Sequence, residues 1–216
     1  MNNLLKLITL LQITREQPLT GWFIAGIKRS EVPTLAEHHY TATLIGWLLA
    51  QKIKDAGGKI NERKIVLMLL IHDLNELFGG DISGPLNRKY PDLREYKNKI
   101  GHRAIQLLSS FMDSPTEKQI HVLWKEMEDG VSDESVVVKI VDQMDHQMYM
   151  EHYNYTTKTT PKERDYRPQF IQEHIYKLAE RIGDQKTKKV MDDFLKEFDT
   201  NFFNHGYQGM KILMEH

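Results

Sequence analysis

Apolar side chains recur every three to four residues along most of the chain, which is the spacing that places them on one face of an α-helix. The first such stretch begins at Leu4, and a longer one follows a cap at Thr34. No comparable stretch alternates apolar and polar residues as a half-buried strand would. The pattern therefore predicts an all-α helical bundle with about seven or eight helices.

Capping residues and glycines set the expected helix ends. Thr34, with Glu37 three residues later, predicts a capping box for a helix that runs to about Lys54. Asn61 predicts the cap of a second helix, from Glu62 to Phe78. Further helices are expected at residues 92–112, 115–129, 133–152, 169–182 and 185–203.

Two segments lack the helical pattern. Residues 15–33 contain prolines and glycines that break a long helix, so they should form an irregular arm. Residues 153–168 are polar and bounded by proline, and loops of this length usually cover a site or an interface. We expect one domain over residues 1–216, with its motifs in residues 15–152 and a helical extension at 169–216.

Composition excludes several classes of function. The 216 residues include 29 Lys and Arg against 30 Asp and Glu, so the chain has no excess of positive charge with which to bind nucleic acid. It has no cysteine, which excludes disulfides, thiolate zinc sites and a cysteine nucleophile. Its apolar runs are far shorter than the ~20 residues that span a membrane, and the N-terminal stretch lacks a basic leader. We therefore expect a cytoplasmic protein that binds neither nucleic acid nor membrane.

Histidine and carboxylate side chains fall on apolar helix faces. His38 continues the stripe of Leu35 and Ala42, whereas His39 is rotated by ~100° and is the weaker candidate. His72 and Glu76 follow Leu69 on the next predicted helix, with Asp73 beside them; the list of candidates is thus His38, His72, Asp73 and Glu76. Because burying ionised carboxylates costs several kcal/mol each without a compensating charge, these groups predict a divalent metal. Imidazole and carboxylate together suit Mn, Fe, Co, Ni or Zn.

A further ligand should come from another helix. The helix expected at 133–152 has Asp142 and Asp145 on one row, and their spacing does not separate them.

Three motifs resemble a known family. "EHH" at 37–39, "LLIHDLNELFGGDI" at 69–82 and "VKIVDQMD" at 138–145 resemble the His, His-Asp and Asp motifs of the HD-domain metal-dependent phosphohydrolases. The second motif is similar to that of the bacterial YfbR-type 5′-deoxynucleotidases. The resemblance implies an HD-domain bundle that holds one divalent ion (Co, Mn, Fe, Ni, Zn or Mg), with four ligands: His38, His72, Asp73 and Asp142.

The resemblance also implies residues around the substrate. Glu76 and Asp81 would act as catalytic acid and base, in an order that stays open. Trp22 would lie against the sugar. The bacterial deoxynucleotidases have an arginine just before this tryptophan, where this chain has Gly21, so Arg29 or Lys28 would bind the phosphate or the substrate differs.

The expected reaction is hydrolysis of the 5′-phosphate monoester of a (deoxy)ribonucleoside monophosphate by metal-activated water. Hydrolysis of a nucleoside triphosphate or a phosphodiester is the alternative enzyme class, although the GYP motif of cyclic-dinucleotide phosphodiesterases is absent from the sequence. A non-enzymatic helical binding module is the third hypothesis. A homodimer is expected, partly from the resemblance.

Overall fold

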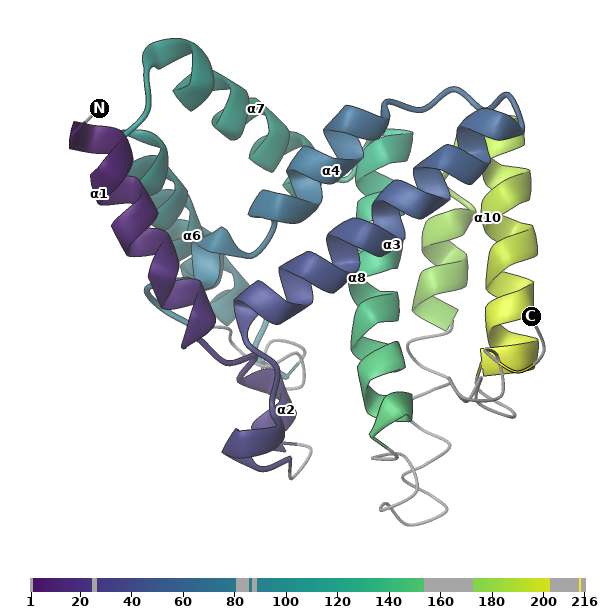
Figure 1. The fold of residues 1–216 in the computed structure, drawn as a ribbon, viewed down its shortest axis with the longest axis horizontal. Coiled ribbons are helices and arrows are strands. Elements are labelled where there is room, and N and C mark those ends of the chain that lie inside the picture. The colour runs from purple at the N-terminus through teal and green to yellow at the C-terminus, as the bar shows by residue number, and fades with distance from the viewer. Residues whose placement is uncertain are drawn as a thin grey trace. The chain divides into compact units, whose positions relative to one another are not determined.

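The computed structural model describes residues 2–24, 27–80, 86, 89–153, 173–202 and 214 of the chain. Within these ranges the backbone forms helices and their connections, and no strand occurs there. The all-α fold is therefore confirmed (Figure 1). No helix in the described ranges has both the length and the apolar character needed to cross a membrane.

The chain forms two compact units. One comprises Met1–Leu44 and Val66–Asp129, and the other comprises Ile45–Ile65 and Gly130–His216. The single domain expected from the sequence stays a prediction.

Helices α3 (Leu35–Asp55) and α4 (Glu62–Ile71) begin at the predicted caps. At α3, the backbone N–H of Thr34 donates to Glu37 Oε2 over 2.7 Å, and the N–H of Glu37 donates to Thr34 Oγ1 over 3.3 Å. At α4, Asn61 Oδ1 accepts from the N–H of Lys64 over 3.1 Å. These side chains satisfy donors that a helix start leaves without partners, so both predicted caps are confirmed.

The first unit also contains a series of helices and short helical turns. They are α1 (Asn2–Leu11), η1 (Gln12–Arg15), α2 (Gly21–Ile24), η2 (Arg29–Glu31), η3 (Leu74–Glu76), α6 (Asp92–Ser109) and α7 (Ser114–Asp129). The described residues of the arm at 15–33 are irregular apart from the short turns, as predicted, and Pro18 forms a bridge with Thr34. The unit's core is apolar and includes Leu35, Ala42, Met68, Leu69, Ile105 and Leu108. Full burial of each such large side chain contributes roughly 1.5–3 kcal/mol relative to exposure.

The second unit contains α8 (Asp133–His152), a helical run over residues 173–179, and α10 (Gln185–Glu197), which continues as the π-helical turn η5 (Phe198–Phe202). Figure 1 shows α8 and α10 with similar axis directions. The core of this unit is apolar and includes Val136, Ile140, Met144, Leu178, Met191 and Leu195.

One predicted helix end differs from the structure, and one predicted loop falls outside the described residues. The second predicted helix was expected to reach Phe78, but α4 ends at Ile71 and a separate 3-10 turn, η3, follows. The loop predicted at 153–168 lies outside the described residues, except for Tyr153.

Candidate metal centre

The end of α4 fixes the orientation of one imidazole. Nδ1 of His72 lies 2.8 Å from the carbonyl oxygen of Leu69. Because a carbonyl only accepts hydrogen bonds, Nδ1 carries the proton and Nε2 presents its lone pair. Asp73 follows with φ −106° and ψ 11°, outside the helical region, so the chain turns here. The helix thus stops where His72 and Asp73 leave its end.

The second imidazole comes from α3. His38 is 1% exposed and continues the fully buried row of Leu35 and Ala42. Its Nε2 lies 3.0 Å from Nε2 of His72. Two ring nitrogens at this distance need a proton or a cation between them.

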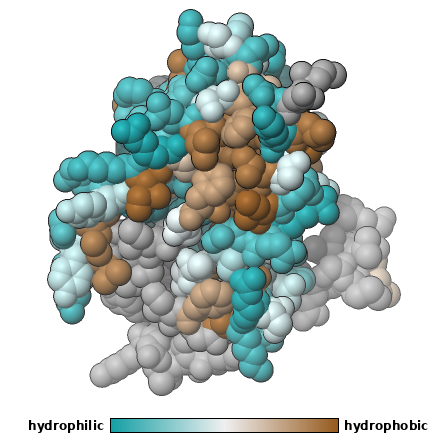
Figure 2. Space-filling view, turned by 90° about the vertical axis from the view of Figure 1, so that its left-hand side faces the viewer, coloured by the Kyte–Doolittle hydropathy of each residue, from teal (hydrophilic) through white to brown (hydrophobic). Residues whose placement is uncertain are grey.

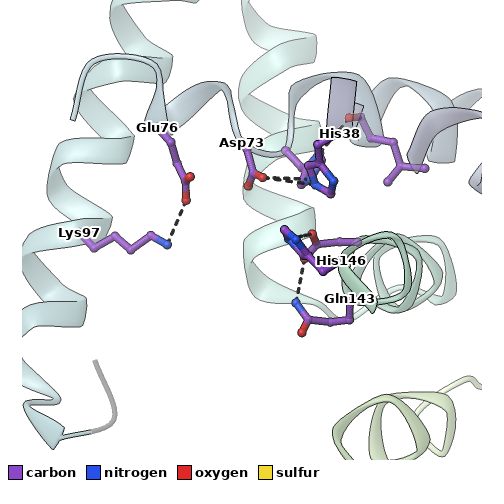
Figure 3. A network of polar contacts seen from close by, with 9 residues as sticks. His38, Asp73, Glu76, Lys97, Gln143 and His146 are labelled. Atoms are coloured by element: carbon purple, nitrogen blue, oxygen red, sulfur yellow. Dashed lines mark hydrogen bonds and ion pairs between the residues drawn. The ribbon is translucent and has the colours of Figure 1, made fainter. Parts of the chain in front are cut away.

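A carboxylate completes a three-residue cluster in the first unit. Oδ2 of Asp73 lies 3.2 Å from His72 Nε2 and 3.7 Å from His38 Nε2 (Figure 3). Metal–nitrogen bonds of ~2.0–2.1 Å place neighbouring ligand atoms roughly 3 Å apart when they bind one ion at near right angles. The spacing of these three atoms, and their imidazole and carboxylate chemistry, therefore fit a divalent ion.

A third imidazole packs against the cluster. His39 is 7% exposed, and its ring centroid lies 4.7 Å from that of His72 and 6.0 Å from that of His38. The sequence ranked His39 as the weaker candidate from its rotation about the helix. Its ring centroid lies close to that of His72 despite that rotation.

A buried carboxylate leaves the same turn. Glu76, at the end of η3, is 8% exposed, and its Oε1 lies 3.1 Å from Nζ of Lys97 on α6 (Figure 3). The sequence predicted Glu76 as the next member of a continuous helix. That helix is interrupted, and the 3-10 turn brings Glu76 into the buried part of the unit instead.

Asp142 and Asp145 both lie on α8, in the second unit. Oδ1 of Asp142 lies 3.3 Å from Nε2 of His146, and its Oδ2 accepts from Gln143 Nε2 over 3.1 Å (Figure 3). Asp145 is the more buried of the two, at 8% exposure. The choice of Asp142 as ligand stays a prediction.

Three of the predicted substrate residues lie in the arm at 15–33. Trp22 lies in α2 and is half-buried, whereas Lys28 and Arg29 are exposed. Nη2 of Arg29 donates to the carbonyl oxygen of Glu16 over 3.2 Å. Asp81 lies outside the described residues.

Sequence reasoning missed Lys97. Glu76 and Lys97 are far apart in the chain, and no short motif joins them. The available signal was Gly101, four residues after Lys97 on the same helix face, because a buried glycine in a helix indicates close approach of another segment.

The chain matches a known domain family, and it is similar to known proteins in sequence or in fold. The family model described as "HD domain" matches residues 12–186, which is most of the chain. A 5′-deoxynucleotidase HDDC2 from Dictyostelium discoideum is 30% identical over 63% of this chain and 68% of its own length. The human 5′-deoxynucleotidase HDDC2 is 23% identical over 92% of this chain and 88% of its own. Among solved structures, a conserved hypothetical protein from Pyrococcus furiosus has a TM-score of 0.66 and 24% identity, covering 90% of this chain and 98% of its own, which shows a shared fold.

Proposed function

Because the chain belongs to the HD-domain family, we propose that it is a metal-dependent phosphohydrolase that cleaves the 5′-phosphate monoester of (deoxy)ribonucleoside monophosphates. One observation carries the proposal: two buried imidazole nitrogens lie 3.0 Å apart, with a carboxylate oxygen 3.2 Å from one of them. The names of the relatives, which are 5′-deoxynucleotidases, support the substrate class. We take deoxyribonucleoside monophosphates as the first hypothesis.

One divalent ion would be held by His38, His72, Asp73 and, as the fourth ligand, Asp142. The first three are supported by their mutual distances, and Asp142 by the motif in which it lies. Such an ion supplies a water of lowered pKa and neutralises phosphoryl oxygens. Its identity among Co, Mn, Fe, Ni, Zn and Mg is left to experiment.

The remaining residues would handle protons and substrate. Glu76 carries a buried carboxylate that can accept a proton from water, and Asp81 would serve the departing ribose oxygen or the sugar hydroxyl. Which of the two acts as acid stays open. Lys28 or Arg29 would bind phosphate oxygens, and Arg29 would first have to leave the carbonyl oxygen of Glu16.

Trp22 would pack against the sugar and exclude a 2′-hydroxyl. We therefore expect Trp22→Ala to hydrolyse ribonucleotides and deoxyribonucleotides at more similar rates than the wild type does. The ratio of kcat/KM for dAMP and AMP measures this. An unchanged ratio would remove Trp22 from the substrate site.

The proposal is tested by assaying phosphate release. The purified full chain is stripped with a chelator, reloaded separately with Mn, Co, Ni, Zn or Mg, and offered nucleoside mono- and triphosphates and a cyclic dinucleotide. We expect metal-dependent release from the monophosphates, fastest from the deoxyribonucleotides. Release only from a triphosphate or diester would move the protein to another reaction of the same metal core, and no release with any ion would overturn an enzymatic function.

We also propose a cytoplasmic homodimer. Apolar side chains remain exposed on α1, where Leu5 is 64% and Ile8 45% exposed. Figure 2 views the side on which α1 lies in Figure 1 and shows apolar residues gathered on that face. Burying such a face in a second copy would remove it from water, and sedimentation velocity measures the oligomeric state directly.

A further inference from the structure

Helix α6 approaches the Leu74–Glu76 turn closely at Gly101. A Cβ built at Gly101 would lie 3.0 Å from Nδ2 and 3.2 Å from Cβ of Asn75. Real Cβ atoms rarely come so near a neighbour, so the absent side chain is what lets the helix and the turn meet. Gly101 is itself buried.

Lys97 lies one helical turn before Gly101, on the same face of α6. The close contact at Gly101 therefore holds the Lys97 side chain over the turn that follows Asp73. Its Nζ lies 3.1 Å from Oε1 of Glu76, whose side chain is 9% exposed against 29% for that of Lys97 (Figure 3).

This ion pair is more buried than a second pair on the same helix. Lys99 and Glu95 also form an ion pair on α6, at 2.6 Å, but their side chains are 66% and 70% exposed. Exposed pairs of this kind contribute little to stability. A carboxylate as buried as that of Glu76 carries a desolvation cost, which a nearby ammonium offsets.

The position of Glu76 makes this pair relevant to chemistry. Glu76 follows the Asp73 turn directly, and its backbone N–H donates to the carbonyl of Asp73 over 2.9 Å. An acceptor for a proton must be held within hydrogen-bond reach of that proton, and small displacements are costly. A short 3-10 turn alone leaves the glutamate side chain several rotatable bonds.

We propose that Lys97 is a positioning residue of the phosphohydrolase reaction: its ammonium fixes the direction of the buried Glu76 carboxylate on the turn that follows Asp73. The inference rests on the proposed function. Lys97 acts through Glu76 and is not itself a ligand of the cluster.

The test compares three substitutions on α6 in the full chain, loaded with its preferred divalent ion. Lys97→Met keeps the length of the side chain without its charge, Lys97→Arg keeps the charge, and Lys99→Met removes the matched exposed pair. We expect kcat to fall about 10- to 100-fold in Lys97→Met, with KM and metal affinity changed less than about threefold. Lys97→Arg should restore kcat to within about fivefold of the wild type, and Lys99→Met should match the wild type.

A double-mutant cycle separates positioning from a structural role. In a Glu76→Gln background, adding Lys97→Met should change the residual kcat less than about twofold, because the residue through which Lys97 acts is already gone. The double variant also leaves no buried charge without its partner, so it serves if Lys97→Met alone fails to fold.

The outcomes are distinguishable. A wild type that hydrolyses no phosphate ester overturns the proposed function and this inference together. If the wild type is active, any of three results overturns the inference alone. These are a wild-type kcat in Lys97→Met, a kcat in Lys97→Arg as low as in Lys97→Met, or losses of kcat from Glu76→Gln and Lys97→Met that multiply in the double variant.

Discussion

At the scale of single residues, hydrogen bonds outside the cluster decide which atoms face it. The carbonyl of Leu69 fixes the tautomer of His72, so Nε2 rather than Nδ1 faces His38 and Asp73. Partners of this kind orient metal-binding histidines and raise their basicity. On the turn that follows, the carboxylate of Glu76 contacts Lys97 of α6. The arrangement of His38, His72 and Asp73 therefore fits the binding of an ion, and that of Glu76 fits proton transfer.

This division of roles predicts the behaviour of Glu76→Ala. The variant should bind the divalent ion as the wild type does, because its cluster atoms are intact, while kcat falls about 100-fold or more. Calorimetric titration with the ion and an assay of phosphate release check the two halves. Loss of ion binding in this variant would instead make Glu76 a ligand.

A second residue carries a stability cost that nothing in the described structure offsets. Gln147 on α8 is 4% exposed, and neither Oε1 nor Nε2 of its amide has a hydrogen-bond partner among the described residues. It lies seven residues after Ile140, on a fully buried apolar row. Buried amide groups without partners typically cost about 1–3 kcal/mol.

Gln147→Met should therefore raise the free energy of unfolding by roughly 1 kcal/mol, since methionine fills a similar volume without polar atoms. Urea denaturation of the two proteins measures the difference. A lower midpoint in the variant would show that the amide binds a group on which the fold depends.

At the scale of elements, capping and local hydrogen bonds determine where helices begin and end. The starts of α3 and α4 could be predicted, because the caps at Thr34 and Asn61 act within four residues of sequence. The end of α4 could not, because the apolar row that includes Leu69 continues into His72 and predicts an unbroken helix. Only the structure places the His72 ring against the Leu69 carbonyl and turns the chain at Asp73.

The start of α10 shows a cap that also joins separate segments. Asp184 accepts from the backbone N–H groups of Thr187 over 2.9 Å and Lys59 over 3.1 Å. These bonds, the one from Thr187 first, hold the pKa of the Asp184 carboxyl below its ordinary value. A carboxyl whose pKa is depressed by folding stabilises the protein above its unfolded pKa, and this contribution is lost as the pH falls through the folded value.

We therefore expect Asp184→Ala to destabilise the protein at pH 7 and to have a smaller effect near pH 2.5, because the contribution of the depressed carboxyl pKa to stability decreases as the pH falls below the ordinary carboxyl range. Thermal unfolding of both proteins at the two pH values measures the difference. Asp193→Ala, which removes an exposed carboxylate paired with Lys189 on the same helix, is the control. An equal loss at both pH values would contradict the cap's electrostatic role.

At the scale of the whole molecule, the sequence could predict the fold class and the grouping of His38, His72 and Asp73. Helical periodicity is a local signal, and His38, His72 and Asp73 all lie on or beside apolar rows that must face a core. Lys97 could not be found in this way, because its contact with Glu76 depends on how α6 packs on the turn. The contribution of Asp142 stays a prediction for the same reason, since it depends on tertiary arrangement.

The central claim is that His38, His72 and Asp73 bind a catalytic divalent ion. The most direct measurement is metal content by mass spectrometry, combined with phosphate release, for the wild type, Asp73→Ala and Asp193→Ala after identical loading. The claim predicts that the wild type and Asp193→Ala retain both the ion and metal-dependent hydrolysis, and that Asp73→Ala loses both. Wild-type metal content and turnover in Asp73→Ala would contradict it.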